Sequence, residues 1–253
     1  MTEAIGSVRE PGILIRPLQE GPDMRIGVDL QQRIWNYAEI DTVPDQMFVV
    51  ARETGGQVLG AFHRDQPIGF AMAFVGAHRG VTYLHSHMVG VVPDYQDRGV
   101  GRMLKLAQRE DAIARGFDLI EWTFDPLQLK NAYFNIARLG AIIRRYIPNL
   151  YGRTTSPLHA GLPTDRLVAE WWLRSPRVEN ILNSDPPVLG TAAVRISIPS
   201  SIRQICAENP AEAEKIQSHV RKQFERHISS GLAATGFEFE DQRGSYLMEP
   251  YED

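Results

Sequence analysis

The sequence predicts a mixed α/β (α+β) sheet flanked by helices, followed by a small C-terminal α+β extension. Between residues 13 and 173, short apolar runs alternate with segments of helical periodicity. With 43% hydrophobic and 23% charged residues, the 253-residue chain has the composition of an ordinary globular protein and enough length for a sizeable core. We therefore predict an α/β domain over residues 1–182 and the extension over residues 187–253.

In the first half, apolar periodicity separates strands from helices. Strands are expected over residues 13–15, 58–62, 68–75 and 82–92, with Arg64-Asp65-Gln66-Pro67 as the turn of a hairpin. Helices are expected over residues 21–37 and 44–55. Side chains alternate along a strand, so one face of the last strand should carry Tyr83, His85, His87, Val89 and Val91.

The second half continues the alternation of strands and helices. A helix over residues 101–115 should end at Gly116, and a second should begin with Asp125 as N-cap and Pro126 at its first position. Strands are expected over residues 119–124, 142–147 and 167–173. After a linker at residues 183–187, the extension should contain a helix capped by Asn209 and strands over residues 194–198, 237–239 and 246–248.

Composition excludes several classes of protein. The formal net charge of −4 gives no reason to expect a nucleic-acid partner. Cys206 is the single cysteine, which rules out an intramolecular disulfide, argues against structural zinc and fits a reducing compartment. Because the sequence shows no apolar run of the length of a signal peptide or membrane span, we expect a cytoplasmic protein without membrane contact.

Residues 89–102 form the most informative segment: an apolar strand, a turn, a glycine-rich loop and the start of a helix. Backbone N–H groups in such a loop point inward, and Gly99 and Gly101 permit close approach of a ligand. The helix N-terminus adds unpaired donors and a partial positive charge, which suits a pyrophosphate. Taken alone, two glycines before a helix are more consistent with a tight turn that binds no ligand.

The segment resembles the acetyl-CoA signature of the GNAT superfamily of N-acetyltransferases, at Gln96, Gly99 and Gly101 after a strand that ends with Val91 and Pro93. In element order the resemblance covers roughly residues 13–173, although its specific part is residues 89–102. A P-loop ending in Gly-Lys-Ser/Thr is absent, and so are the three glycines of a Rossmann loop.

The resemblance implies that acyl-CoA is the co-substrate and that an acceptor amine attacks the thioester directly, without a metal. It implies that the backbone of Val89 and Val91 contacts the pantetheine arm and the thioester. The pyrophosphate is then held by Gln96, Asp97, Arg98, Gly99, Val100, Gly101 and Arg102.

Two residues compete for the role of general base. His85 precedes Val91 by six residues, where histone-acetylating relatives place a carboxylate, and histidine titrates near neutral pH. Glu121 lies in an otherwise apolar strand, where a carboxylate is costly unless it is solvated or functional. The alternatives are that His85 and His87 are polar residues of a half-exposed strand and that Glu121 forms a surface ion pair.

The predicted helix before Gly140 departs from the family pattern. Ile136 stands where many relatives have the tyrosine that protonates the leaving thiolate. Tyr133 is the nearest substitute, although a tyrosine on an apolar helical stripe also suits core packing. The usual coenzyme-binding asparagine is displaced as well, so that Leu129 occupies its place and Asn131 is the nearest candidate.

The acceptor itself stays open. Residues 144–153 gather arginines and tyrosines that either bind an anionic acceptor or form a solvated strand edge. Our leading hypothesis is transfer to the primary amine of a small metabolite; the alternatives are an acyl-CoA sensor without turnover and a protein lysine acetyltransferase. The apolar stripe of the C-terminal helix also leaves a homodimer open.

Overall fold

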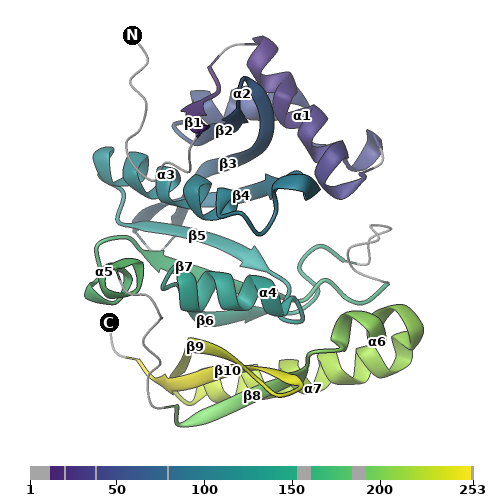
Figure 1. Ribbon diagram of the computed structural model, residues 1–253. Coiled ribbons are helices and arrows are strands. Elements are labelled where there is room, and N and C mark those ends of the chain that lie inside the picture. The colour runs from purple at the N-terminus through teal and green to yellow at the C-terminus, as the bar shows by residue number, and fades with distance from the viewer. Residues whose placement is uncertain are drawn as a thin grey trace. The chain divides into compact units, whose positions relative to one another are not determined.

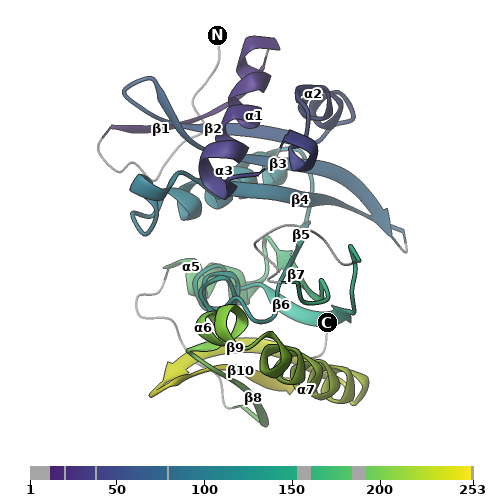
Figure 2. The same cartoon turned by 90° about the vertical axis from the view of Figure 1, so that its right-hand side faces the viewer.

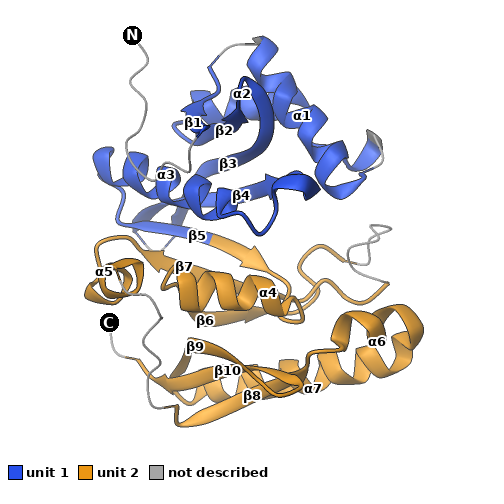
Figure 3. Cartoon of the chain, in the orientation of Figure 1, with its two compact units in different colours: residues 1–121 blue, residues 122–253 orange. Residues whose placement is uncertain are grey.

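The computed structural model describes residues 12–19, 21–37, 39–78, 80–152, 161–183 and 192–251. The chain divides into two compact units, residues 1–121 and residues 122–253 (Figure 3). The predicted linker at residues 183–187 lies almost entirely outside the described residues, and the predicted division at that place stays a prediction. Among the helices of the described residues, none is long and apolar enough to cross a membrane.

The first unit is built on an antiparallel sheet of four strands in the order β1-β2-β3-β4 (Figure 1). Their bounds are β1 Ile13–Pro17, β2 Gln57–His63, β3 Gln66–His78 and β4 Val81–Val91. The predicted hairpin turn is shorter than expected, because Arg64 and Asp65 alone make it, with φ of 48° and 67°. Two consecutive residues with positive φ are typical of the tight turns that match strand twist.

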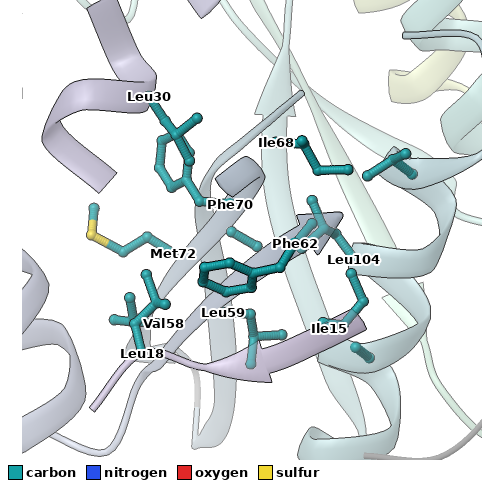
Figure 4. Close-up of a cluster of buried hydrophobic side chains, with 14 of the residues drawn as sticks. Ile15, Leu18, Leu30, Val58, Leu59, Phe62, Ile68, Phe70, Met72 and Leu104 are labelled. Carbon is teal, nitrogen blue, oxygen red and sulfur yellow. The ribbon is translucent and has the colours of Figure 1, made fainter. Parts of the chain in front are cut away.

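The helices of the first unit are α1 Gly21–Trp35, α2 Asp45–Glu53 and α3 Val100–Ala114, with short 3-10 turns at η1 Glu39–Asp41 and η2 Pro93–Tyr95. A cluster of buried apolar side chains joins them to the sheet (Figure 4). Phe70 of β3 packs against Phe48 of α2 and Trp35 of α1, with ring centroids 5.8 and 5.7 Å apart. This packing holds β4 and the start of α3 on a rigid support.

Buried hydrogen bonds also fasten α3 to the sheet. Gln57 Nε2 of β2 donates to Gln108 O at 2.9 Å and to Asp111 Oδ2 at 2.6 Å. Lys105 Nζ donates to Ser86 Oγ of β4 at 2.9 Å, and Ser86 Oγ donates to Gln108 Oε1 at 3.0 Å. As predicted, α3 is followed by Gly116 in the left-handed region, with φ of 83°.

The second unit also combines a sheet with helices (Figure 2). Its strands follow the order β5-β7-β6-β9-β10-β8 from the end of β5 Leu119–Phe124. The others are β6 Ile142–Ile147, β7 Arg166–Trp172, β8 Val194–Pro199, β9 Leu232–Glu240 and β10 Arg243–Pro250. Because β9 pairs with β6 at Ile143↔Ala234, the strands of the predicted extension continue the sheet formed by β6 and β7.

The helices of the second unit are α4 Leu129–Ala132, a π-helical segment η3 Tyr133–Arg138, α5 Pro176–Asn183, α6 Ile202–Glu208 and α7 Pro210–Ser229. Asn209 caps α7 as predicted, since its side chain accepts a hydrogen bond from Glu212 N–H. The sequence did not indicate α5 and α6. The predicted start of α4 at Asp125-Pro126 is wrong, because Asp125 Oδ1 accepts from Leu127 N–H at 2.8 Å in a turn that precedes the helix.

Candidate functional site

A β-bulge interrupts β4 in the middle of the predicted site. Met88 pairs with Met72, and Ser86 pairs with the next residue of β3, Ala73, so His87 is an extra residue without a cross-strand partner in the register. Such an insertion breaks the alternation of side chains. The prediction that His85, His87, Val89 and Val91 share one face is therefore wrong.

The bulge sends its two flanking segments to opposite faces of the sheet. On the carboxyl-terminal side, a Cβ at Gly90 would meet Ile34 and Trp35, so the face that Gly90 shares with Phe70 is covered by α1. Val89 and Val91 lie on the other face, the face of Ser86, which hydrogen-bonds to residues of α3. His85 pairs with Phe74 and so lies on the α1 face.

One hydrogen bond shows which pairs of β3 and β4 are hydrogen-bonded: Val92 N–H donates to Ile68 O at 2.9 Å. Hydrogen-bonded and non-hydrogen-bonded pairs alternate along an antiparallel ladder. The pairs of Val91 with Gly69 and of Val89 with Ala71 are therefore the non-hydrogen-bonded ones. The N–H and C=O groups of Val89 and Val91 consequently point away from β3, toward the edge of β4 at which β5 pairs with Leu84 and His85.

The loop after β4 is a sequence of tight turns. Tyr95 N–H donates to Val92 O and Gln96 N–H to Pro93 O, at 2.9 and 3.1 Å. Gln96 Nε2 reaches back to Val91 O at 3.0 Å and so closes the loop upon the end of β4. Asp97 has a φ of 58°, which asparagine and aspartate tolerate better than most residues.

The loop leads directly into the N-terminus of α3. Gly99 is the N-cap, with φ of 80° and ψ of −7°, and because it has no side chain it makes no side-chain hydrogen bond to the first turn of α3. Met103 N–H makes the first bond of the helix, to Gly99 O at 3.0 Å. The N–H groups of Val100, Gly101 and Arg102 precede that bond and are the donors that an α-helix cannot satisfy internally.

Gly99 and Gly101 are glycines for different reasons. Gly99 needs its left-handed conformation, whereas Gly101 is helical and no strain requires glycine there. A Cβ at either position would meet no atom within 4 Å. The surface of the described chain is therefore open at Gly101, although alanine at this position would favour the helix.

Arg98 is the exposed cation of the loop. Its guanidinium lies over the ring of Tyr95, with Cζ 5.3 Å from the centroid. Tyr95 Oη in turn shares a hydrogen bond of 2.7 Å with His63 Nδ1 of β2. Arg102, in the first turn of α3, is partly buried. The contacts with Tyr95 and His63 therefore hold Arg98 next to the N-terminus of α3.

The two predicted bases are neighbours, because His85 and Glu121 are register partners in the parallel pair of β4 and β5. Glu121 is 8% exposed, and His85 is half-buried. The ring of His87 lies near those of Phe74 and His85, and desolvation of its covered part lowers the pKa of His87. In the described ranges, no group of three or more His, Cys, Asp or Glu side chains is arranged to hold a metal ion.

The predicted helix before Gly140 is set differently from a regular α-helix. Its second half is the π-helical segment η3, in which Ile136 is fully buried and Asn135 O accepts a hydrogen bond from Ala141 N–H. Tyr133 is partly buried, and its ring lies 5.8 Å from that of Phe239 in β9. Asn131 is exposed at the start of this helix. The roles predicted for Tyr133 and Asn131 stay predictions.

The arginines of residues 144–152 are largely engaged with the same sheet, while Arg153 lies outside the described residues. Arg144 Nη2 lies 2.6 Å from Glu170 Oε2, and Arg145 Nε lies 3.7 Å from Glu170 Oε1. Glu170 thus pairs with Arg144 and Arg145, two of the arginines for which the sequence suggested binding of an anionic acceptor.

A polar cluster at the ends of β5, β6 and β7, in which Asp165 and Arg166 are buried, was not predicted. We name Asp125, Tyr146, Asp165, Arg166 and Arg221 the polar cluster. Tyr146 and Arg221 both hydrogen-bond to Asp165, and Arg166 lowers the pKa of Asp125 while burial, the larger effect, raises it. The signal was the run Thr164-Asp165-Arg166, polar residues at the start of an apolar strand.

Residues 25–135 match the model of the acetyltransferase (GNAT) family. This span contains α1, β4, the glycine loop and α3. None of the curated proteins matches the chain in sequence.

Solved structures of acetyltransferases share its fold. The ribosomal-protein-S18-alanine N-acetyltransferase of Escherichia coli is 18% identical, with 62% of this chain and 92% of that chain covered and a TM-score of 0.50. Aminoglycoside 6′-acetyltransferase type Ii is also 18% identical, with 64% of this chain and 98% of that chain covered and a TM-score of 0.51. Naa50 of Arabidopsis thaliana, solved with the bisubstrate analogue CoA-Ac-MVNAL, is 15% identical, with 63% of this chain and 98% of that chain covered and a TM-score of 0.50. The predicted fold class and the predicted family resemblance are confirmed.

Proposed function

We propose that the chain is an N-acyltransferase that uses acyl-CoA as co-substrate, because residues 25–135 match the model of the GNAT acetyltransferase family. In this proposal, an acyl group passes directly from coenzyme A to the primary amine of a small metabolite. The observation that carries it is the convergence of two sets of backbone donors. The N–H groups of Val89 and Val91 point away from β3, and a few residues later the N-cap residue of α3 is a glycine without a side chain, so the backbone of the first turn is accessible.

Each set of donors suits one part of the coenzyme. An extended pantetheine arm has amide groups that can pair with the outward peptide groups of a strand, as an added strand would. A pyrophosphate needs several N–H donors and positive charge, which the N-terminus of α3 supplies with Arg98 beside it. The open space at Gly99 and Gly101 lets phosphate oxygens approach that backbone.

The chemistry follows from an amine and a thioester. The acceptor ammonium must lose a proton, and His85 with Glu121 beside it is the pair that we assign to this step. The amine nitrogen then bonds to the thioester carbon, a backbone N–H stabilises the oxyanion, and the carbon–sulfur bond breaks. The leaving thiolate takes up a proton, for which Tyr133 is the candidate donor.

Binding and turnover separate this proposal from its alternatives. Isothermal titration calorimetry with acetyl-CoA and longer acyl-CoAs tests the coenzyme site, and a thiol-release assay with a panel of amines tests transfer. Absence of coenzyme binding would refute the proposal as a whole. Tight binding without thiol release for any amine would favour a non-catalytic acyl-CoA sensor.

The sensor is the second candidate because the buried Ile136 replaces the expected tyrosine. A protein lysine acetyltransferase is the remaining alternative. Transfer to lysine-containing peptides, with no transfer to free amines, would identify that activity.

A further inference from the structure

We propose that His63 is a positioning residue for the coenzyme: through the ring of Tyr95 it holds the guanidinium of Arg98 ready for the diphosphate of acyl-CoA. This inference rests on the proposed function and assigns a role in it to His63 and Tyr95, which the sequence did not indicate as part of the site. It depends on a chain of side-chain contacts that lies entirely within the first unit.

Arg98 is held by a contact that leaves its hydrogen-bond donors available. Its side chain is exposed, and Cζ lies 5.3 Å from the ring centroid of Tyr95. In the part of the chain that the structure describes, no carboxylate pairs with Arg98. Because the guanidinium stacks through its flat face, the N–H groups in its plane can still donate to phosphate oxygens.

Arg16, another arginine of the first unit that stacks on an aromatic ring, has a carboxylate partner. Its Cζ lies 4.3 Å from the ring centroid of Phe62, and its Nη1 lies 2.7 Å from Asp23 Oδ2. That ion pair uses the donors of Arg16 within the protein. Arg98 has the same kind of ring contact without an ion pair, so its charge is available to a ligand.

A hydrogen bond to the neighbouring sheet fixes the ring that supports the guanidinium. Tyr95 Oη and His63 Nδ1 are 2.7 Å apart, and the two rings meet edge to face with centroids 5.6 Å apart. His63 is the last residue of β2, directly before the tight turn at Arg64 and Asp65. Its half-buried imidazole lies against the backbone of Gly12, where a Cβ would approach Cδ2 of His63 to 3.3 Å. The imidazole therefore has a defined place on the sheet.

The chain of contacts ends beside the N-terminus of α3. Arg98 directly precedes the N-cap Gly99, and the surface at Gly99 and Gly101 is open. An exposed arginine samples many rotamers, and ordering it when a ligand binds reduces affinity. A guanidinium that Tyr95 already holds avoids most of that loss. The hydrogen bond of His63 should therefore raise the affinity for the coenzyme although His63 itself does not contact it.

A double-mutant cycle tests this role. Calorimetry measures the dissociation constant of acetyl-CoA for the wild type, His63→Phe, Tyr95→Phe, Arg98→Gln and the double variant His63→Phe/Arg98→Gln, at a temperature at which circular dichroism shows each of them folded. Phenylalanine keeps an aromatic ring at either position and removes the hydrogen bond. The matched control is His78→Phe, because His78 is an exposed histidine at the end of β3.

We expect His63→Phe and Tyr95→Phe each to weaken binding of acetyl-CoA about fivefold, which corresponds to about 1 kcal/mol, and Arg98→Gln to weaken it at least about tenfold. In the Arg98→Gln background His63→Phe should cause no further loss, because its hydrogen bond acts only through the guanidinium. His78→Phe should bind like the wild type. The inference is overturned if His63→Phe or Arg98→Gln keeps wild-type affinity, or if His63→Phe weakens binding equally with and without Arg98.

The same titrations separate the inference from the proposed function. A wild type that does not bind acetyl-CoA would refute the acyltransferase proposal and the inference with it. Wild-type binding that His63→Phe leaves unchanged would refute the inference alone. For an amine that is turned over, His63→Phe should raise the KM for acetyl-CoA about fivefold and leave kcat unchanged, since the coenzyme is held less tightly while the reacting groups stay in place. A fall in kcat with an unchanged KM would contradict a positioning role toward the coenzyme.

Discussion

The substitution Gly101→Ala should stabilise the protein and at the same time weaken its binding of acyl-CoA. Gly101 is the second helical residue of α3, its backbone is helical, and an added Cβ would meet no atom within 4 Å. Alanine is favoured over glycine inside a helix by about 0.5–1 kcal/mol. Since Gly101 lies in the first turn, we expect about 0.5 kcal/mol, which raises the melting temperature by about 1–2 °C.

The coenzyme should respond in the opposite direction. A methyl group at this position occupies the space through which a phosphate oxygen reaches the N–H groups of the first turn. Loss of one such charge-assisted contact lowers affinity at least tenfold, or by about 1.4 kcal/mol. Calorimetry with acetyl-CoA measures the affinity, and thermal unfolding without ligand measures the stability of the same preparation.

Two further glycines provide matched controls at the ends of α3. Gly99 and Gly116 have φ of 80° and 83°, and a Cβ at either would meet no atom within 4 Å. Alanine at each should cost about 1–2 kcal/mol of backbone strain. Gly99→Ala should lose coenzyme affinity in addition, whereas Gly116→Ala should not. If Gly101→Ala binds acetyl-CoA like the wild type, the pyrophosphate does not contact this turn and the reasoning fails.

Three other substitutions test separate parts of the structure. Asn209→Ala should lower the unfolding free energy by about 1 kcal/mol, because Asn209 Oδ1 caps α7 through Glu212 N–H; an unchanged denaturation midpoint would contradict the cap. Lys105→Met should raise thermal stability at pH 7, and its advantage should shrink toward pH 10.5. Burial lowers the pKa of Lys105 in the folded state, so below 10.5 the unfolded chain binds a proton that the folded protein does not; a difference independent of pH would show that this titration does not matter. Tyr133→Phe keeps the ring beside Phe239 and removes the hydroxyl, so kcat should fall about a hundredfold with the KM for acetyl-CoA unchanged; a loss below tenfold would assign Tyr133 to packing.

The sequence predicted those elements of the fold that depend on residues close together in the chain. The glycine loop, the end of α3 at Gly116 and the cap of α7 at Asn209 depend on residues a few positions apart, and the structure has them where they were expected. The bulge at His87 was not predictable, because it exists only in the pairing with β3. The sequence of a strand does not reveal an inserted residue when the residues on both of its sides are apolar or aromatic.

The same distinction separates the glycine loop from the polar cluster. Backbone donors after Val91 follow from a continuous segment and were visible in the glycine spacing. The polar cluster brings together residues 125, 146, 165 and 221, which are far apart in the chain, so their proximity follows only from the fold. For this reason Asp125 was predicted as a helix cap, although its hydrogen bond to Leu127 forms a turn before the helix.

Two residues of the described chain depart from what local stability favours. Gly101 lies in a helix where alanine would be more stable, and Lys105 buries an amine. Departures from local optimality concentrate at functional sites, where a ligand offsets their cost. The proposed contact of the coenzyme with the first turn of α3 would account for Gly101. Lys105 donates a buried hydrogen bond to Ser86, the residue before the bulged His87, and so joins α3 to β4 at the bulge.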